Sequence, residues 1–470
     1  MRWREKKVVI VGAARQGVAL ARYMAEGGAH VTLNDRRAME KLEDAVKSLS
    51  DLPVHWVCGG HPLELLNGID LLCLSGGVSP AIPLAVEASA RMIPVSNDSQ
   101  IFLEETPCAV VGITGSAGKT TTTALLGQIA SQKYWSRRQS EVYRPELGAA
   151  VWVGGNIGNP LIADVAEMRS GDLAVMELSS FQLELMNRSP QVAVLLNITP
   201  NHLDRHRTME AYTAAKRRIL EFQGESDTAV LGRDDPGAWS LRDEVRGKLA
   251  VFGSGDPGGG YHGSYVEDGE IHLRDETGNQ TLMETTSVPL RGHHNMLNVL
   301  AAAATARAVG IAPALIRSGI ESFSGLSHRL EFVRTWGGAD WINDSIATAP
   351  ERTIAALRAY DPPIVLLAGG RDKDLPWESL AQEIHRRVDH LILFGEAASI
   401  ILEAFGEPKQ GHRRLTISRC AGLHDAVLEA SRLVQPGDTV LLSPGGTSFD
   451  EFGDFEERGD RFKKWVNQLS

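Results

Sequence analysis

GITGSAGKTTT, residues 112–122, follows the apolar run Ala109–Val111 and leads into a helical pattern that continues to Ala130. A buried strand, a glycine-bearing turn and a helix in this order are typical of a loop that holds the phosphates of a nucleotide. In such a loop, small residues let backbone N–H groups face the phosphates, Lys119 reaches the outer phosphates, and the Thr120 hydroxyl ligates magnesium. The positive N-terminal end of the helix faces the same anion.

This loop predicts an ATP site in the middle of the chain. The expected contacts are Gly115, Ser116, Ala117, Gly118, Lys119, Thr120 and Thr121. The spacing departs from the strict form G-x-x-x-x-G-K-[ST], because Ile113 stands where the first glycine should be. A glycine–lysine pair in an ordinary surface turn is the alternative that this departure leaves open.

The composition indicates a soluble protein with several domains. A chain of 470 residues with 43% hydrophobic content is long enough for about three domains. The formal net charge of -11 argues against binding to nucleic acid or to an anionic membrane, which require basic surfaces. The longest uncharged stretches, such as 71–86, are too short and too broken to span a bilayer. Four cysteines without C-x-x-C spacing suit a reducing cytoplasm and no structural zinc.

Residues 1–106 alternate short β-branched runs with helical patterns, which is typical of a parallel sheet with crossover helices. The opening residues resemble a signal peptide, but Arg15 and Gln16 interrupt the apolar run, so we expect a first strand there. The turn Gly12–Gly17 approximates a Rossmann phosphate turn, and Asp35 ends the second strand, where an acid commonly binds sugar hydroxyls. A glycine turn that serves only helix packing is equally open.

Residues 107–325 contain two further apolar runs that end in polar residues, Glu177 and Asn197. Active sites of open α/β sheets lie at such strand ends. Glu177 is therefore expected to organise magnesium, although an acid can simply mark the exit of a strand.

Two other stretches of this segment differ from the alternating pattern. The polar stretch 134–147 is expected to be a mobile loop, and residues 253–278 are expected to form a small excursion of antiparallel strands.

Other polar residues of this segment are ambiguous on their own. NITPNHLDRH places His202, Asp204 and His206 past a strand end, where a histidine usually has no special role. Lys216 lies in the helical pattern MEAYTAAKRRIL and would ordinarily be a surface lysine; near a divalent cation it would have to lose its charge. Asn298 is a candidate reader of the adenine edge.

Residues 326–470 alternate strand and helix patterns again, which predicts a second doubly wound sheet. The turn 445–448 follows an apolar strand and precedes a helical pattern, so its hydroxyl and N–H groups are suited to a carboxylate. Lys373 follows another strand and is a candidate countercharge. Both features are also compatible with ordinary loops.

The three segments together predict an α/β fold with three domains. They are a Rossmann-like domain at 1–106, a central P-loop ATPase-type domain at 107–325 and a Rossmann-like domain at 326–470.

Nine motifs occur in the order found in the Mur ligases, and the resemblance spans all three segments. They are GITGSAGKTTT, VGGNIGNP, MELSSFQLE, NITPNHLDRH, AAKRRI, GHHNMLNVLAAAA, GLSHRLE, WINDS and LLSPGGTSFDEF. MELSSFQLE and GGNIG resemble most closely the branch that adds glutamate to UDP-N-acetylmuramoyl-L-alanine. The resemblance implies an ATP-dependent ligase of peptidoglycan synthesis that forms an amide bond through an acyl phosphate. It also implies a cytoplasmic monomer that uses two magnesium ions.

The resemblance assigns roles to individual residues. Lys119, Glu177, His202 and Lys216 are expected at the reaction centre, and Thr120, Glu177, His202 and a carbamoylated Lys216 at the metal ions. Asn298, Arg329 and Asp344 are expected to contact ATP. The UDP-linked substrate is expected to contact Arg15, Gln16, Asp35, Arg37, Asn156 and Ser179. The incoming glutamate is expected to contact Thr348, Lys373, Ser448 and Phe455.

Two departures from the family pattern leave alternatives open. Ala117 stands where asparagine is frequent, and Ile346 stands where many members carry a lysine. A subgroup with a similar stretch after Ile346 is associated with L-glutamate, so both enantiomers and other amino acids remain candidates. A ligase that extends folate would lack the first domain. A nucleotide-dependent switch that makes no bond is the alternative from outside the ligases.

Overall fold

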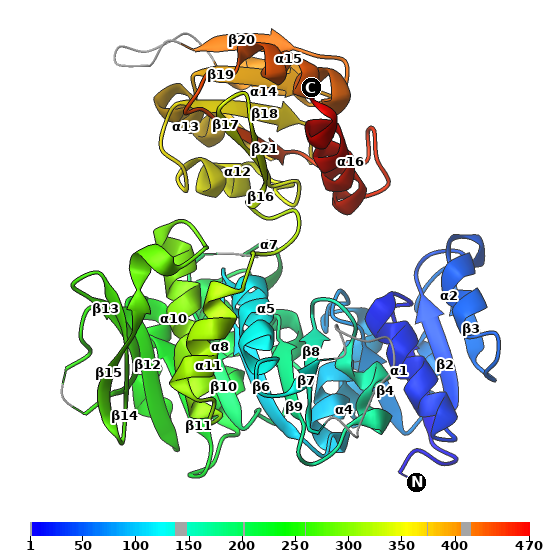
Figure 1. The fold of residues 1–470 in the computed structure, drawn as a ribbon. Helices are drawn as coiled ribbons and strands as arrows, with labels where there is room; N and C mark the ends of the chain where they lie inside the picture. The colour runs from blue at the N-terminus through cyan, green and yellow to red at the C-terminus, as the bar shows by residue number, and fades with distance from the viewer. Residues whose placement is uncertain (1, 137–147, 201–202, 259, 374, 406–414) are drawn as a thin grey trace. The chain divides into compact units, whose positions relative to one another are not determined.

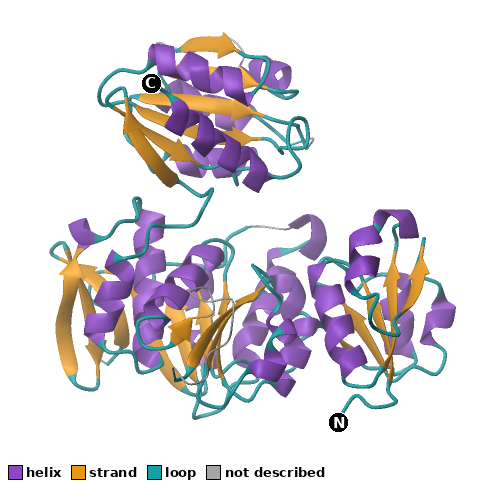
Figure 2. Cartoon of the chain, turned by 45° about the vertical axis from the view of Figure 1, so that its right-hand side comes forward, coloured by secondary structure: helices purple, strands orange, loops and turns teal. Residues whose placement is uncertain are grey.

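The computed structural model describes the chain except residues 1, 137–147, 201–202, 259, 374 and 406–414. Three sheets flanked by helices form an α/β fold, as the alternating patterns predict (Figures 1 and 2). The chain divides into two compact units, residues 1–288 with 297–323, and residues 289–296 with 324–470. The first two sheets lie in the first unit and the third in the second, and the predicted domain boundaries stay a prediction.

The first sheet has five parallel strands in the order β3-β2-β1-β4-β5. Its strands are β1 (Lys7–Val11), β2 (His30–Asp35), β3 (His55–Cys58), β4 (Leu71–Leu74) and β5 (Val95–Ser96). Its helices are α1 (Arg15–Glu26), α2 (Glu43–Ser48), α3 (Pro83–Ala90) and α4 (Asp98–Glu105). Any side chain at Gly17 would come within 1.9 Å of the Gly12 carbonyl oxygen, so close packing of α1 on β1 requires this glycine.

The second sheet has ten strands in the order β15-β14-β13-β12-β11-β10-β6-β9-β8-β7. Its strands are β6 (Ala109–Thr114), β7 (Trp135–Ser136), β8 (Ala150–Gly155), β9 (Leu173–Glu177), β10 (Val192–Leu195), β11 (Thr228–Gly232), β12 (Lys248–Ser254), β13 (His262–Glu267), β14 (Glu270–Asp275) and β15 (Gly278–Glu284). The central strands are buried on both faces, which explains their continuous apolar runs. Among the described strands of this sheet, only β13-β14-β15 pair antiparallel, which confirms the predicted excursion.

Seven helices of the described residues accompany this sheet. They are α5 (Lys119–Ala130), α6 (Ser180–Leu183), α7 (Leu203–His206), α8 (Met209–Glu221), α9 (Pro236–Trp239), α10 (His293–Ala308) and α11 (Pro313–Glu321). The loop predicted at 134–147 is wrong at its start, because Trp135 pairs with Ala150 and forms the edge strand β7. The rest of that stretch, 137–147, lies outside the described residues.

The third sheet has six strands in the order β16-β17-β21-β18-β19-β20, with only β16 antiparallel to its neighbour. Its strands are β16 (Glu331–Trp336), β17 (Ala339–Asn343), β18 (Ile364–Gly369), β19 (His390–Phe394), β20 (Thr416–Arg419) and β21 (Thr439–Gly445). Its helices are α12 (Pro350–Leu357), α13 (Glu378–Arg387), α14 (Ala398–Phe405), α15 (Leu423–Leu433) and α16 (Phe455–Gln468).

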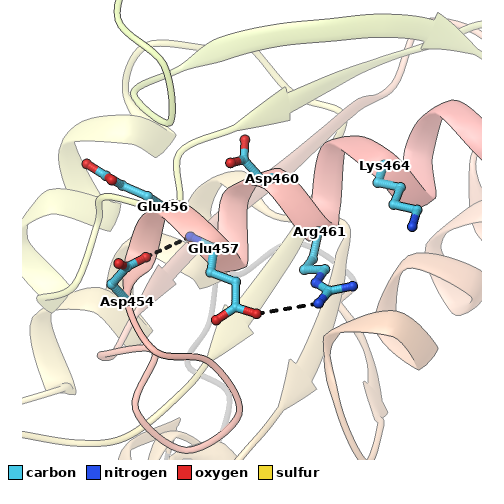
Figure 3. A pocket seen from close by; sticks show the side chains of 6 residues that line it. All are labelled: Asp454, Glu456, Glu457, Asp460, Arg461 and Lys464. Atoms are coloured by element: carbon cyan, nitrogen blue, oxygen red, sulfur yellow. Dashed lines mark hydrogen bonds and ion pairs between the residues drawn. The ribbon is translucent and has the colours of Figure 1, made fainter.

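Helix α16 has a charged outer side and a buried inner side. The Asp454 carboxylate caps its start by accepting a 2.7 Å hydrogen bond from the Glu457 N–H group. Figure 3 shows Glu457 facing Arg461 on the outer side, where the two side chains lie 3.6 Å apart. Phe462 and Val466 are fully buried on the inner side. The pattern is that of an amphipathic helix that anchors the end of the chain to the third sheet.

No helix among the described residues has both the length and the apolar content that crossing a membrane requires.

Candidate active site

The carboxyl ends of neighbouring parallel strands bring the phosphate loop, Glu177 and Asn156 to one edge of the second sheet. Thr114 of β6 is in register with Leu195 of β10, and Ile113 of β6 with Glu177 of β9. The phosphate loop follows β6, and Asn156 follows β8, which pairs with β9. Residues that lie far apart in the chain therefore meet at this edge, as expected for an open α/β sheet.

The phosphate loop has a backbone that only glycine accommodates at one position. Gly118 has φ +84° and caps α5, and a Cβ atom there would lie 2.2 Å from the Asn298 side-chain oxygen. The same oxygen accepts a 3.3 Å hydrogen bond from the Thr122 hydroxyl. Asn298 is thus buried against the loop, and its predicted contact with adenine stays a prediction.

Asn197 holds the phosphate loop from the end of β10. Its side-chain oxygen accepts a 2.8 Å hydrogen bond from the Ala117 N–H group, and its amide donates to the Ala117 carbonyl at 3.2 Å. The Asn197 carbonyl also accepts from the Ser116 N–H group at 3.0 Å. The sequence signal for this role was a polar residue at a strand end, but the bonding pattern requires the fold. These bonds shape the loop before any anion binds, which is how electrostatic sites are preorganised.

Lys119 folds back over the loop in the ligand-free chain. Its ammonium donates to the Gly115 carbonyl oxygen at 2.9 Å and to the Ser116 carbonyl oxygen at 3.4 Å. Phosphate oxygens are stronger acceptors than carbonyl oxygens for a cation. A bound nucleotide can therefore replace these two bonds without moving the helix that carries the lysine.

Glu177 has one satisfied and one unsatisfied carboxylate oxygen. The side chain is 2% exposed, and Oε1 accepts a 3.0 Å hydrogen bond from the Asn156 amide. Oε2 is buried, and no described residue donates a hydrogen bond to it. A buried carboxylate oxygen without a partner is costly, so its natural partner is a ligand of positive charge.

Lys216 is buried beneath the phosphate loop, so the surface position that its helix pattern predicts is wrong. It is 1% exposed, and its amine donates to the Gly115 carbonyl oxygen at 2.9 Å. Burial, and next the positive charge of Lys119, lower the pKa of Lys216 well below its usual value, and Glu177 opposes this only in part. This environment favours the uncharged, nucleophilic form of the amine over the ammonium form.

His206 joins three short helices around this edge. Its ring lies 2.9 Å from the Ser180 hydroxyl oxygen on one side and 3.0 Å from a Glu184 carboxylate oxygen on the other. The ring stacks on Phe181 and lies 5.1 Å from the ring of Tyr212, measured between centroids. The motif placed His206 near the site, but the sequence does not show that it positions the segment that follows Glu177.

Part of the predicted metal site cannot be placed. His202 lies outside the described residues, and nothing is described of the Asp204 side chain. Among the described residues, no group of three or more His, Cys, Asp or Glu side chains is arranged to hold a metal ion. The described metal-ligand candidates are the Thr120 hydroxyl, the Glu177 carboxylate and Lys216. Their metal roles stay predictions.

The residues predicted for the UDP end of the substrate cluster at the carboxyl edge of the first sheet. Asp35 accepts hydrogen bonds from the Ala13 N–H group at 2.8 Å and from the Arg37 guanidinium at 2.9 Å. Partial burial acts to raise the pKa of Asp35, but these bonds and the Arg37 N–H group lower it to about 2. Gln16 accepts from the Gly76 N–H group, and Arg15 donates to the Gly158 carbonyl. Their contacts with a nucleotide stay predictions.

Two other predicted substrate contacts also have structural roles. The Ser179 side chain caps α6 and shares a reciprocal capping box with Gln182, so its place in the motif is explained without a ligand. Asn156 orients Glu177 through the hydrogen bond described above. Neither role excludes a contact with substrate.

In the second unit, the predicted nucleotide contact Asp344 is buried at the end of β17. Its carboxylate accepts hydrogen bonds from the Ser443 hydroxyl at 2.8 Å and from the Leu330 N–H group at 3.2 Å. Burial raises the pKa of Asp344 to about 7, although Ser443 and the charge of Arg329 oppose this shift. Arg329 lies between His328 and Leu330, which both have a left-handed backbone, at φ +62° and φ +45°. Such a strained turn fixes the position of the arginine.

The residues predicted for glutamate lie on loops at the carboxyl edge of the third sheet. The Lys373 amine is 3.5 Å from the Thr348 hydroxyl oxygen. Ser448 is buried in the turn after β21, next to Thr447, which exchanges backbone hydrogen bonds with Arg371. The Phe455 carbonyl accepts from the Ser345 hydroxyl. Their contacts with an amino acid stay predictions.

Arg458 organises these loops and was not singled out from the sequence. It is fully buried, and its guanidinium donates to the Ser345, Gly446 and Thr447 carbonyl oxygens and to the Ser345 hydroxyl, at 2.9–3.1 Å. Burial lowers the pKa of Arg458 to about 10. An arginine in a helix that is otherwise rich in surface charges gives no sequence signal that it points inward.

Comparison with known proteins covers nearly the whole chain. Residues 6–97 match the profile of the MurD-like N-terminal domain of Mur ligases, 113–306 that of the Mur ligase middle domain, and 328–446 that of the Mur ligase glutamate ligase domain. The UDP-N-acetylmuramoylalanine–D-glutamate ligase of Symbiobacterium thermophilum is 38% identical over 466 residues, which is 99% of each chain. The enzyme of the same name from Caldanaerobacter subterraneus subsp. tengcongensis is 37% identical over 470 residues and covers 100% of both chains.

Solved structures share the fold at low identity. The UDP-N-acetylmuramate-alanine ligase MurC of Thermotoga maritima has a TM-score of 0.57 and 19% identity, covering 98% of this chain and 99% of that chain. The MurF ligase of Thermotoga maritima, solved in complex with ADP, has a TM-score of 0.56 and 18% identity, covering 99% and 96%.

The buried Lys216 should reduce the stability of the ligand-free chain. Because its pKa is lower in the folded than in the unfolded chain, the unfolded chain binds more protons, and the wild type gains stability as pH rises. In buffer free of carbon dioxide, Lys216→Met should therefore raise the melting temperature, by about 2–4 °C per kcal/mol of stability gained. This advantage should shrink as pH rises toward about 10.5, the usual pKa of a lysine. An advantage that does not change with pH would contradict a lowered pKa of Lys216.

Proposed function

The chain belongs to the Mur ligase family, and from this we propose that it is the ATP-dependent ligase that joins D-glutamate to UDP-N-acetylmuramoyl-L-alanine. The product is a precursor of peptidoglycan. Full-length relatives that are named for this reaction support the assignment. The proposal includes a cytoplasmic, monomeric enzyme that serves cell-wall synthesis and thereby cell shape and division.

The observation that carries the proposal is the buried amine of Lys216 beneath the phosphate loop, near the Glu177 carboxylate, whose Oε2 receives no hydrogen bond from a described residue. Both are costly to bury, and both lie at the edge where the phosphates of ATP are expected. Costly polar groups of this kind concentrate at catalytic sites.

The reaction requires a carboxylate to become an electrophile. The alanyl carboxylate oxygen attacks the γ-phosphorus of ATP, the bond to the β-phosphate oxygen breaks, and ADP leaves. The amine of glutamate then attacks the carbonyl carbon of the acyl phosphate, loses a proton, and expels inorganic phosphate. Both steps bring anions together, so the chain must supply positive charge and alignment more than covalent chemistry.

The residues of the phosphate loop fit that task. The backbone N–H groups of Gly118 and of the start of α5 can hold the β- and γ-phosphates, with Lys119 exchanging its carbonyl partners for phosphate oxygens. The loop residues Gly115, Ser116 and Ala117 line the same site. Gly118 keeps the loop backbone open to the ligand. We place adenine beside Asn298, with Arg329 and Asp344 as further nucleotide contacts.

The donor set around Glu177 fits magnesium. Its unsatisfied oxygen and the Thr120 hydroxyl are hard oxygen ligands of the kind that magnesium prefers, and we place His202 with them. Two such ions would neutralise the phosphates and the substrate carboxylate. Asn156 keeps the Glu177 carboxylate oriented whether or not a cation is bound.

Lys216 fits a carbamate. An uncharged amine can attack carbon dioxide to form an N–C bond and release a proton, which converts a cation that repels metal into an anion that attracts it. The lowered pKa of Lys216 increases the share of the amine that is uncharged and able to react. We therefore include a carbamoylated Lys216 among the metal ligands of the working enzyme.

We place the UDP end of the substrate on the first sheet, at Arg15, Gln16, Asp35 and Arg37. Asn156 and Ser179 lie toward the reacting end, and glutamate is placed at Thr348, Lys373, Ser448 and Phe455. The ion pair between Asp35 and Arg37 supports this placement, because it holds the turn after β1 in a fixed shape.

The assignment predicts phosphate release that depends on both co-substrates. With ATP and magnesium, the protein should release phosphate only when UDP-N-acetylmuramoyl-L-alanine and glutamate are both present, and the product mass should show one added glutamyl residue. D-glutamate should be favoured over L-glutamate by about tenfold or more in kcat/KM. Phosphate release that needs neither co-substrate would point to a nucleotide-dependent switch instead.

The carbamate predicts chemical rescue. Lys216→Ala should slow turnover by about a hundredfold or more, because a metal ligand is lost at the point of charge development. Formate or acetate should restore part of the rate by occupying the space of the carbamate. Arg217→Ala is the matched control, since this neighbour on α8 is 45% exposed and should leave turnover unchanged. Full activity of Lys216→Ala would exclude the carbamate.

A further inference from the structure

The turn Ile346–Thr348, which follows β17, carries a positive side chain at each end. The Arg352 guanidinium donates a 3.2 Å hydrogen bond to the Ile346 carbonyl oxygen, and the Lys373 amine lies 3.5 Å from the Thr348 hydroxyl oxygen. The turn is held by a 2.9 Å bond from the Thr348 N–H group to the Ile346 carbonyl. A 2.8 Å bond from the Gly445 N–H group to the Ala347 carbonyl attaches it to β21. Two cations from different elements are thus fixed on one short segment.

Within the described part of the chain, no carboxylate forms an ion pair with either cation. Arg352 and Lys373 are both exposed. This distinguishes Arg352 from other exposed arginines of the unit: Arg371 pairs with Glu396, and Arg358 with Glu383. Arginines on protein surfaces commonly find such partners, so an unpaired one beside a lysine is a candidate anion site.

The charges around the turn also repel one another. Burial, then the charges of Arg352 and Arg458, lower the pKa of Lys373. Asp344, whose pKa the charge of Arg352 acts to lower, is buried, accepts from Ser443 and Leu330, and has a raised pKa of about 7. It therefore offsets only part of the positive charge. An anionic ligand at the turn would relieve this repulsion.

We propose that Arg352 binds a carboxylate of the incoming glutamate, together with Lys373, at the turn Ile346–Thr348. This inference rests on the proposed function and adds to it a residue that the sequence motifs did not assign. Because position 346 is an isoleucine, the turn itself carries no cation. The Arg352 side chain extends from the first turn of α12 to the Ile346 carbonyl oxygen. A planar guanidinium can hold both oxygens of a carboxylate, which suits it to select a substrate with a second acidic group.

The test is the effect of charge at position 352 on glutamate alone. Arg352→Ala and Arg352→Gln should each raise the KM for glutamate by about 30-fold, as expected for a lost charge-assisted contact. The KM values for ATP and for the UDP-linked substrate, and kcat at saturating glutamate, should change by less than about threefold. Arg352→Gln keeps a donor for the Ile346 carbonyl, so it separates the charge from the structure of the turn.

A cation supplied from the turn itself should restore binding. In the double variant Ile346→Lys with Arg352→Ala, the KM for glutamate should return to within about fivefold of the wild type, because position 346 lies beside the lost guanidinium. Arg461→Ala is the matched control, since Arg461 is an exposed arginine of the same unit that pairs with Glu457 (Figure 3). It should leave every KM unchanged.

The outcomes separate this inference from the assignment beneath it. An unchanged KM for glutamate in both Arg352 variants, with normal turnover, would overturn the role of Arg352 and leave the ligase assignment intact. A wild-type protein that shows no glutamate-dependent phosphate release would instead overturn the proposed function.

Discussion

The reaction centre depends on one buried hydrogen bond, from the amine of Lys216 to the Gly115 carbonyl oxygen of the phosphate loop. Burial and the nearby Lys119 both disfavour the ammonium form of this lysine and lower its pKa. The same contact therefore ties α8 to the phosphate loop at a cost in stability, which is the kind of local cost that proteins retain for function. The proposed carbamate would use the uncharged amine that this environment favours.

The parallel sheet makes this arrangement possible. Strands β6, β9 and β10 end in register, so the phosphate loop, Glu177 and Asn197 arise from segments that are distant in sequence and adjacent in space. Asn197 and Asn156 orient the loop and the carboxylate through short, fixed hydrogen bonds. In the third sheet, too, the proposed site lies at the carboxyl edge of the strands, where Arg352 and Lys373 contact one turn. The proposed phosphate site combines N–H groups with Lys119 at the edge of the second sheet, and the proposed carboxylate site at the edge of the third sheet uses side-chain cations.

Local sequence rules predicted the elements well because the central strands are covered on both faces and therefore read as continuous apolar runs, as in β1, β9 and β18. The glycine at position 118 was also predictable, because the phosphate-loop pattern requires a glycine there, and the turn leaves no space for a side chain. The side-chain network was less accessible. The burial of Lys216 contradicts its helix pattern, because neighbouring elements cover that side of α8. Arg458 and His206 form their bonds with residues more than ten positions away, and no local pattern encodes those partners. The family resemblance nevertheless pointed to a functional role for Lys216. The role proposed for Arg352 follows only from its contact with Ile346 in the structure.

The central claim is that the edge around Gly115, Glu177 and Lys216 transfers the γ-phosphoryl group of ATP to a substrate carboxylate. Isotope transfer tests it most directly. UDP-N-acetylmuramoyl-L-alanine labelled with ¹⁸O in its carboxylate should pass one labelled oxygen to inorganic phosphate in each turnover with D-glutamate, as measured by mass spectrometry of the phosphate. Phosphate that carries no label, formed while the amide product accumulates, would contradict an acyl phosphate and the account of the site built on it.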